Sequence, residues 1–550
     1  MPIRRDGVLL LAILGVACLV PLAARQQGAP GLETIRQAEL RADLFFLAAD
    51  AMRGRLTDTP ENLATADYIR SRFERAGLAP AAGGSYFQNY LLMTATLGEG
   101  NRLDVVTGEG AARHLEHGQE FYPQRFSASG TVSAPVVFAG FGITAPALGY
   151  DDYAGDVKGK VVLVIDHEPG ERDSKSPFDG GATAEPAAPW RKALAAQEHG
   201  AVAILFVADV HNHPEAVNLE QAARNVWPAT APHLKTYTLA AWADRLRIPA
   251  VQVSPALAGS LVAGTGRSLA DLATSAETAK GLAAVALPGA HVTLTTSVVR
   301  HTVPDRNVVA MIEGSDPVLK DEWVLVTAHF DHDGADGPRI MNGADDNGSG
   351  TVALLEIADA WAEALRQKQR PKRSVLFAAW NSEERGLLGA WAFTEAPLVP
   401  LAKIAGVLNM DMIGRNEEVE VGGGPRFNGL EVQTAESNAN TLNVMGHARA
   451  PQLAAVMDTA NAGIGLSLLK RYDNNTSNLV RRSDQWPFLQ RGVPALGFMT
   501  GLHPDYHTVY DRPEKINYPK MEKIARLVHQ ASWTLANAAT RPAGPAANVR

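Results

Sequence analysis

The chain has 550 residues, of which 46% are hydrophobic and 20% are charged, a balance typical of a globular protein with two or three domains. Its formal net charge of −8 at neutral pH, without a long basic run, argues against a nucleic-acid-binding protein. The single cysteine is Cys18, so the rest of the chain has neither disulfides nor thiolate ligands, and any metal must be held by His, Asp and Glu.

Residues 1–30 have the pattern of a secretory signal peptide. Arg4 and Arg5 precede an apolar run over residues 8–24, and a polar stretch follows. We therefore expect an exported protein, periplasmic or extracellular, without stable membrane association. The apolar run also approaches the length of a short membrane-spanning helix, so a retained anchor is the alternative.

Residues 33–125 are expected to form the N-terminal part of the main domain and to begin with two helices. The second helix should start after Thr59, which caps it, with Pro60 in its first turn, and should end at Gly77. The segment Arg53-Gly54-Arg55 between the helices is expected to be a turn or a packing corner without chemistry.

The pattern changes near residue 130. Short Val-rich runs alternate with loops rich in Gly and Pro, which predicts a small, separate β-rich domain over residues 130–290. The predicted strands include 134–142, 201–206 and 248–253, residues 157–166 are predicted to be a turn leading into a buried strand, and a helix is predicted over 190–198.

An α/β pattern runs from residue 296 to residue 540, and the Pro/Ala-rich tail 541–550 is expected to be disordered. Short apolar runs that turn polar abruptly predict buried parallel strands. The expected fold is therefore α/β, a mostly parallel central sheet flanked by helices, with the β-rich domain inserted. Four strands are predicted in this segment, over 322–330, 374–380, 404–410 and 493–500.

Ionisable residues follow each of these four strands. Those residues are His329, the pair Glu383-Glu384, Asp411 and His507, while Asp345 lies in a Gly-rich loop leading into a helix. Each of them alone is explained by a hydrogen-bonded histidine, a helix cap or a turn. Together they indicate one site, because the carboxyl ends of parallel strands share an edge where ligands bind.

The same residues carry a resemblance to a known family. The set His329-x-Asp331, 343–350 (GADDNGSG), Glu383-Glu384, 409–411 (NMD) and 506–508 (YHT) resembles the co-catalytic di-zinc aminopeptidases. That family includes bacterial leucyl aminopeptidases, glutamate carboxypeptidases, glutaminyl cyclases and the non-catalytic transferrin receptor. The middle segment resembles the protease-associated domain that is often inserted in such enzymes.

The resemblance implies two Zn²⁺ per chain. His329 and Asp411 would bind one ion, Glu384 and His507 the other, and Asp345 would bridge both. A shared carboxylate would hold the two ions close together and offset part of their charge.

The resemblance also assigns residues around the metals. Glu383 would be the general base and Tyr506 would stabilise the developing oxyanion. Asp331 would accept the second ring N–H of His329, and Asp346 would support the loop that carries Asp345.

The favoured function is an exported zinc exopeptidase, an aminopeptidase that hydrolyses N-terminal residues of peptides. Three alternatives remain: a carboxypeptidase or dipeptidase of the same family, a glutaminyl cyclase with one zinc, and a non-catalytic binding protein on this scaffold. Metal content and a panel of free and blocked peptides would separate them.

Overall fold

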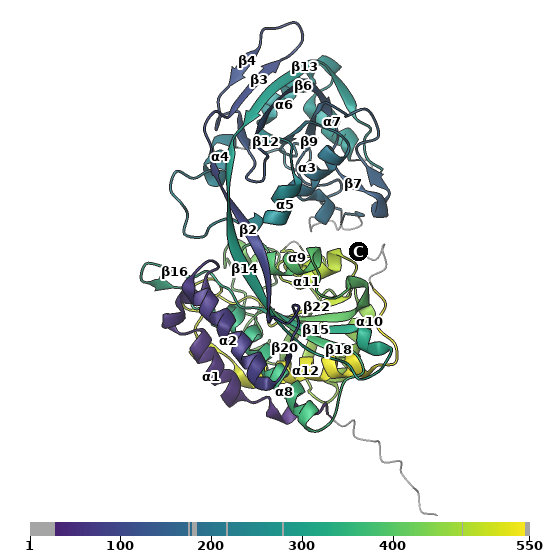
Figure 1. Cartoon of the computed structure of the whole chain (residues 1–550). Helices are drawn as coiled ribbons and strands as arrows, with labels where there is room; N and C mark the ends of the chain where they lie inside the picture. Colours follow the sequence, from purple (N-terminus) through teal and green to yellow (C-terminus); the bar gives the residue numbers. More distant parts are fainter. Residues whose placement is uncertain are drawn as a thin grey trace, which may run out of the picture.

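The computed structural model describes residues 28–173, 176–178, 184–215, 218–277, 280–475 and 477–544. The predicted signal peptide therefore lies, up to residue 27, outside the described residues. Within the described ranges, no helix has the length and apolarity needed to cross a bilayer. The chain forms two lobes, a main lobe around a ten-stranded sheet and an upper lobe around an eight-stranded sheet (Figure 1).

The main lobe is built on the four predicted strands. They form a parallel core in the order β18-β15-β19-β22, which confirms the predicted strands and their direction. Antiparallel strands flank this core on both sides, which the sequence did not indicate. The ten strands of the whole main sheet are β1 (Ala79–Pro80), β2 (Phe87–Leu97), β11 (Thr238–Leu239), β14 (Val298–Ile312), β15 (Trp323–His329), β18 (Ser374–Trp380), β19 (Ile404–Met410), β20 (Thr441–Met445), β21 (Ser467–Leu469) and β22 (Ala495–Met499).

Helices cover both faces of the main sheet, and their apolar sides form its core. One core cluster joins the sheet to α10, whose bounds are given below, and to α1 (Gln37–Leu47), α2 (Pro60–Ala76), α8 (Gly350–Arg366) and α12 (Tyr518–Asn537). A second cluster joins the other face to α9 (Leu388–Glu395) and α11 (Gln485–Gln490), while α10 (Pro451–Asn461) packs on α12.

The boundaries of α2 follow its local sequence. The Thr59 hydroxyl accepts a hydrogen bond from the Asn62 N–H, and Pro60 occupies the first helical position. Gly77 ends the helix in the left-handed conformation, at φ 79°. Both ends of this predicted helix are therefore confirmed.

The upper lobe contains more than the β-rich domain that the sequence predicted. Its sheet has the order β4-β3-β13-β6-β9-β10-β12-β5, in which β6, β9, β10 and β12 are parallel and carry helices between them. The strands are β3 (Arg102–Val106), β4 (Arg113–Leu115), β5 (Phe121–Pro123), β6 (Gly130–Phe138), β9 (Val161–Ile165), β10 (Ala203–Val207), β12 (Ala250–Val253) and β13 (Val285–Thr296), and the helices are α3 (Pro189–Glu198), α4 (Leu219–Val226), α5 (Ala240–Arg245), α6 (Pro255–Val262) and α7 (Leu269–Ala276).

The structure moves one domain boundary. Residues 102–123 form β3, β4 and β5 of the upper sheet, whereas the sequence placed them in the main domain. The reason is long-range pairing: β3 pairs with β13 and β5 with β12, and neither partner is close in sequence. Local alternation of apolar residues does not identify such partners.

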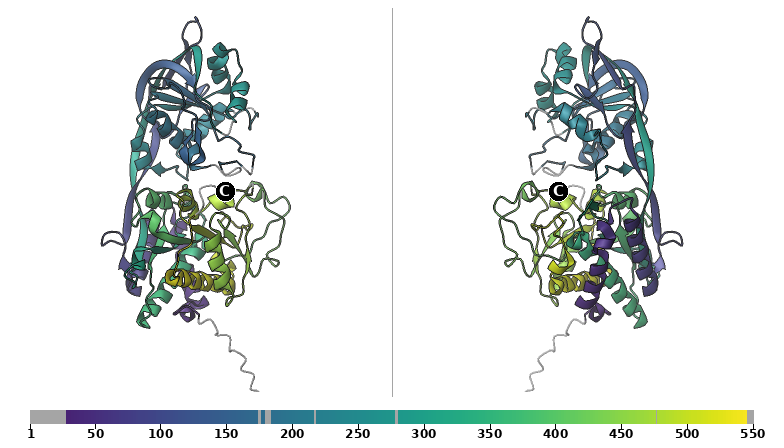
Figure 2. Two further views of the ribbon diagram at one scale, coloured as in Figure 1. Left: turned by 90° about the vertical axis from the view of Figure 1, so that its right-hand side faces the viewer. Right: turned by 90° about the vertical axis from the view of Figure 1, so that its left-hand side faces the viewer.

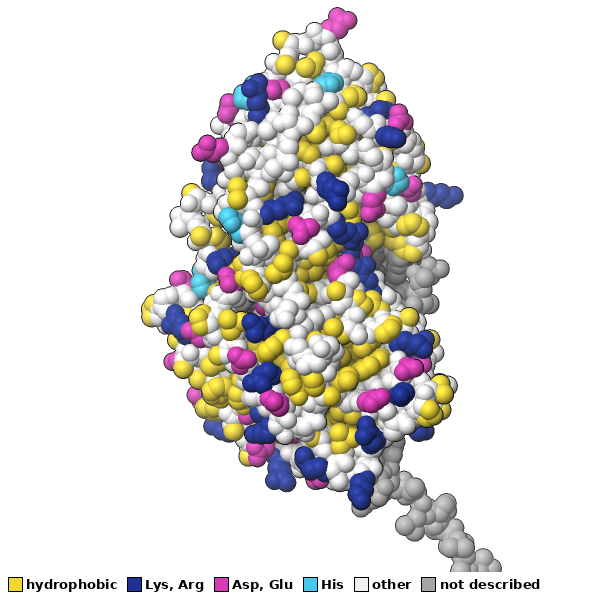
Figure 3. All heavy atoms as spheres, in the orientation of Figure 1, with side chains coloured by type: hydrophobic (Ala, Val, Ile, Leu, Met, Phe, Trp, Pro, Cys, Tyr) yellow, Lys and Arg dark blue, Asp and Glu magenta, His cyan; other side chains and the backbone are white. Residues whose placement is uncertain are grey.

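The two lobes are joined by a pair of long strands. β2 and β14 pair from Phe87↔Val308 to Leu97↔Val298 and run from the main sheet up to the other lobe (Figures 1 and 2). On the face in Figure 3, acidic and basic side chains are interspersed over both lobes. Part of the tail predicted to be disordered is fixed, since the Ala543 N–H donates to Gln452 on α10 at 2.8 Å.

Candidate metal centre

The predicted site residues meet at the carboxyl edge of the parallel core. His329 is the last residue of β15, Asp411 follows β19, and Glu383 and Glu384 follow β18 by three and four residues. His507 lies on the loop after β22. Because these strands are parallel neighbours, the fold brings the side chains into one pocket, as the sequence predicted.

Two groups of potential ligands share this pocket. In the first group, His329 Nε2 lies 3.3 Å from Asp411 Oδ1 and 3.8 Å from Glu383 Oε2. In the second group, His507 Nε2 lies 3.4 Å from Glu384 Oε2. Among the described residues, the two groups comprise His329, Glu383 and Asp411, and His332, Asp346, Glu384 and His507.

The carboxylate of Asp346 lies between the groups. Its Oδ1 is 3.4 Å from His329 Nε2, and its Oδ2 is 2.9 Å from His507 Nε2. A carboxylate that presents one oxygen to each group has the geometry of a bridging ligand. Asp346 reaches this position from the loop before α8.

Asp345, for which the sequence predicted the bridging role, points away from this pocket. Its Oδ1 accepts a hydrogen bond from the Gly414 N–H at 2.6 Å, and its Oδ2 lies 3.2 Å from His503 Nε2. The prediction for Asp345 needs correction, because adjacent residues on this loop project in different directions and only Asp346 faces both groups. The sequence could not separate two neighbouring aspartates.

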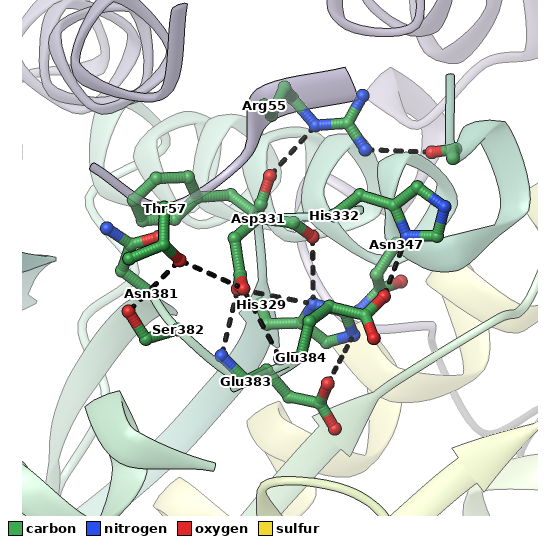
Figure 4. Close-up of polar contacts among 12 residues, drawn as sticks. Arg55, Thr57, His329, Asp331, His332, Asn347, Asn381, Ser382, Glu383 and Glu384 are labelled. Carbon is green, nitrogen blue, oxygen red and sulfur yellow. Dashed lines mark hydrogen bonds and ion pairs between the residues drawn. The ribbon is translucent and has the colours of Figure 1, made fainter. Parts of the chain in front are cut away.

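His332 is a site residue that the sequence analysis did not single out. Its side chain is fully buried, and its Nδ1 lies 2.7 Å from Glu384 Oε1. Its position within the stretch 329–333 was the available signal, but only His329-x-Asp331 matched the motif. Figure 4 shows the imidazole directed at Glu384.

Asp331 organises the loop after β18 more than it holds His329. Its carboxylate accepts hydrogen bonds from the N–H groups of Glu383 at 3.0 Å and Glu384 at 3.3 Å. The nearest acceptor to His329 Nδ1 is the backbone carbonyl of Asp331, at 3.3 Å, whereas the carboxylate lies 3.7 Å away. Asp333 has the corresponding place beside His507, with its Oδ2 2.9 Å from His507 Nδ1.

Arg55 supports the site through hydrogen bonds, although the sequence analysis assigned no chemistry to the turn 53–55. The buried guanidinium donates to the carbonyls of Phe330, Asn342 and Gly343, at 2.7–2.8 Å. It thereby ties the loop after β15 to the loop before α8. The adjacent Gly54, at φ 69°, has no room for a side chain, because a Cβ there would lie 2.2 Å from the Met341 carbonyl oxygen.

The electrostatics of the pocket are dominated by buried carboxylates. Burial raises the pKa of Glu383 well above its ordinary value, and Asp411 and Glu384 raise it further, while His329 opposes the shift. Burial would lower the pKa of His329, but Glu383 and Asp411 raise it well above its ordinary value. Asp484, also buried, has no hydrogen-bond partner for either carboxylate oxygen among the described residues.

This charge balance provides a test of whether the site fits metal ions. Four carboxylates and three histidines converge, so the negative charge exceeds what the neighbouring protein cations offset. Divalent cations bound by carboxylates and imidazoles would supply the missing positive charge, and zinc prefers such a donor set. The residues therefore fit bound zinc, and Asp346 faces both groups of ligands.

A cavity of about 280 Å³ opens beside these groups. Its acidic side is formed by Asp346, Glu383, Glu384 and Asp411. Its remaining lining is mostly apolar, with two arginines and Tyr506 at the edge, and consists of Gly386, Leu387, Met412, Met445, Leu479, Arg481, Arg482, Ser483, Met499, Leu502 and Tyr506.

Comparison with known proteins agrees with this geometry. Residues 307–532, which contain every ligand candidate named above, match the model of peptidase family M28. The match covers β15, β18, β19 and β22 and the loops that carry the two ligand groups, which are called the M28 site below. The match to the family model agrees with the resemblance that the motifs carry.

The individual relatives named below are 17–29% identical to this chain. The chain is 29% identical over 223 residues to the "Glutamate carboxypeptidase 2 homolog" of Caenorhabditis elegans, a match that covers 38% of this chain and 26% of that protein. It is 28% identical over 266 residues to "Leucine aminopeptidase 2" of Trichophyton equinum, covering 48% and 46% of the two chains. The solved aminopeptidase of Aneurinibacillus sp. strain AM-1 has a TM-score of 0.46 and 17% identity, over 94% of this chain and 97% of that chain.

Proposed function

We propose that this protein is a zinc-dependent exopeptidase that removes N-terminal residues from peptides. One zinc ion would be bound by His329, Asp346 and Asp411, and the other by Asp346, Glu384 and His507. The observation that carries the proposal is the position of Asp346, whose two carboxylate oxygens face His329 and His507 separately. When bound, the two ions would polarise the scissile carbonyl and lower the pKa of a water molecule.

Glu383 is the proposed general base. It lies in the lining of the cavity, and it belongs to the first ligand group without being needed to complete the bridge. Its carboxylate would take a proton from the attacking water and pass it to the nitrogen of the leaving amine as the peptide C–N bond breaks. Its backbone N–H donates to Asp331, which fixes the backbone from which the side chain extends.

Tyr506 is the proposed donor to the developing oxyanion. Burial raises the pKa of its hydroxyl, and the nearby carboxylates of Asp346 and Glu384 raise it further, while His507 and Arg482 oppose the shift. The hydroxyl therefore keeps its proton at neutral pH and can donate it in a hydrogen bond. Arg482 donates to the same oxygen at 3.1 Å and would orient it.

The shape of the cavity supports an aminopeptidase. Glu383, the carboxylate of the lining that is not proposed as a zinc ligand, would attract the α-ammonium group of a free N-terminus. On the same cavity wall, Met412, Met445, Met499, Leu479 and Leu502 offer an apolar surface to the first side chain. Peptides that begin with a large aliphatic residue should therefore be the preferred substrates.

One observation favours a second candidate, a carboxypeptidase. Arg481 and Arg482 also line the cavity and could bind a substrate carboxylate. A panel of peptides decides between the two functions: free-amine peptides, N-acetylated peptides and C-amidated peptides of the same sequence. Loss of hydrolysis on N-acetylation alone supports the aminopeptidase, and loss on C-amidation alone supports the carboxypeptidase.

Two further alternatives have distinct signatures in the same assay. Conversion of an N-terminal glutamine peptide to its cyclised form with one zinc ion at the main-lobe site would indicate a glutaminyl cyclase, and absence of both turnover and zinc at that site would indicate a binding protein. Export through residues 1–30 is part of the proposal and is tested by N-terminal sequencing of the protein from the periplasmic or extracellular fraction.

A further inference from the structure

A third cluster of potential metal ligands lies in the upper lobe, away from the M28 site. It consists of His167, Glu171 and His213. β9 and β10 are neighbouring parallel strands, with Ile165 paired to Val207, and both histidines lie on the loops that follow them. The topology thus places two imidazoles and a carboxylate at one edge of the upper sheet.

The donor atoms of this cluster converge. His167 Nδ1 lies 3.1 Å from Glu171 Oε1, and His213 Nε2 lies 2.8 Å from Glu171 Oε2. The ring centroids of the two histidines are 4.5 Å apart. Zinc bonds of about 2.0–2.2 Å place tetrahedral ligand atoms about 3.3 Å from one another. One ligand atom from each of the three residues lies within 4.8 Å of the other two, so a modest contraction would close the site on an ion.

The surrounding contacts fix both loops before any ion binds. The buried ammonium of Lys192 donates to the carbonyl oxygens of Ile165 and His167. Such anchoring limits the conformational entropy that ligand binding would otherwise cost.

The second loop is fixed in the same way. The Asp209 carboxylate accepts the N–H groups of His211 and Asn212, and the Asp209 carbonyl accepts the N–H of His213. Glu277 connects the loops, because it accepts both from the Gly170 N–H at 2.7 Å and from the Asn212 side chain at 2.7 Å. Both histidines are therefore presented by a rigid frame.

We propose that His167, Glu171 and His213 bind a third zinc ion, in addition to those of the M28 site. Two imidazoles with one carboxylate favour zinc over calcium or magnesium, which prefer oxygen ligands. The simpler explanation is that Glu171 forms ion pairs with both histidines. Neutral imidazole N–H groups can also donate hydrogen bonds to Glu171, whereas a divalent ion would be bound by ring nitrogens that carry no proton. The zinc content of the variants below separates these two arrangements.

The three residues would leave one coordination position of the ion open. The side chains of His167 and His213 are 41% and 42% exposed, so water can reach a fourth position. The ion would link the loops after β9 and β10. Glu171 also interacts electrostatically with Arg481 in the lining of the M28 cavity, so occupancy would change the charge that faces this cavity.

The test is a comparison of zinc content in the full-length protein. The wild type, His213→Ala and Glu171→Gln are equilibrated in low-micromolar buffered free zinc, and metal per chain is measured by mass spectrometry. We expect each variant to hold about one zinc ion fewer than the wild type. His211→Ala is the matched control, because His211 lies on the same loop but contacts Thr274 instead of Glu171.

Equal zinc content in the wild type and in both variants would overturn the third site, as would a matching loss in His211→Ala. Glu171→Gln preserves side-chain size, so it keeps the test valid if His213→Ala does not fold. The difference of one ion does not depend on how many ions the M28 site holds. A failure of this proposal is therefore distinct from a failure of the proposed function, which Asp346→Asn tests.

Discussion

Two buried regions of the main lobe contain histidines whose pKa values are shifted in opposite directions. At the carboxyl edge of the sheet, His329 is fully buried and its pKa is raised, because Glu383 and Asp411 outweigh the effect of burial. Between α8 and α12, His529 is equally buried, but burial lowers its pKa to about 4. Its neighbours are the Trp361 ring and the Pro30 carbonyl, which accepts from its Nε2 at 2.8 Å.

The comparison teaches that burial alone does not define a functional histidine. His529 stays neutral and fastens the segment before α1 to α12. His329 is surrounded by carboxylates, and that excess of negative charge is what divalent cations would balance. Four predictions test this difference, from the largest expected effect to the smallest.

Asp346→Asn should abolish peptidase activity and remove most of the bound zinc, because it takes charge from the ligand that faces both groups. The adjacent Asp345→Asn should retain both zinc ions, since an amide oxygen can still accept from the Gly414 N–H. Zinc content and turnover of the two variants provide the measurement. Normal zinc binding by Asp346→Asn, with loss in Asp345→Asn, would restore the original assignment.

Glu383→Gln should keep its zinc and lower kcat by about 10²–10⁴-fold, because an amide of the same shape cannot accept a proton. Glu384→Gln should weaken zinc binding instead, since Glu384 lies among the ligands of the second group. Steady-state kinetics beside metal analysis separates these effects. Near-normal turnover of Glu383→Gln would rule out its role as the base.

His332→Ala should weaken binding of the zinc ion proposed at Glu384 and His507 by about 10–100-fold, because it removes the partner that orients Glu384. His447→Ala is the control, as His447 is a half-buried histidine that pairs with Asp473 outside the site. Zinc affinity from chelator competition is the readout. Unchanged affinity in His332→Ala would show that Glu384 is positioned without it.

His529 should make the fold sensitive to acid. Its folded-state pKa, about 4, is below the ordinary value of 6.5, so the unfolded chain binds a proton more readily between these pH values. The free energy of unfolding should therefore fall as pH drops from 6.5 to 4, by up to about 3 kcal/mol from this group.

His529→Gln should reduce that slope, because glutamine keeps an N–H donor for the Pro30 carbonyl but does not titrate. His301→Gln, at an exposed position on β14, is the control. Urea unfolding at pH 7 and pH 4.5 measures the difference. Equal pH slopes in the wild type and His529→Gln would contradict the account of this buried histidine.

The sequence predicted the parallel core because its strands are short, apolar and end abruptly in polar residues. It predicted the gathering of His329, Glu383, Glu384, Asp411 and His507 for the same reason, since parallel neighbours end at one edge. It did not resolve Asp345 from Asp346, because the direction of a side chain on an irregular loop depends on tertiary contacts.

Other features were missed because their evidence lies in distant pairings. Arg55 reaches the site through carbonyl groups far along the chain, and carbonyl acceptors leave no pattern in the sequence. β3 and β5 were placed in the main domain for the same reason, as their partners β13 and β12 follow more than a hundred residues later.

The most direct test of the central claim is a crystal structure of the zinc-loaded protein with anomalous data collected on both sides of the zinc absorption edge. The account predicts two adjacent zinc peaks on either side of the Asp346 carboxylate, each about 2.0–2.2 Å from one of its oxygens. One peak should also contact His329 and Asp411, and the other Glu384 and His507. A zinc peak bound by Asp345 and His503, or no peak beside Asp346, would contradict the account.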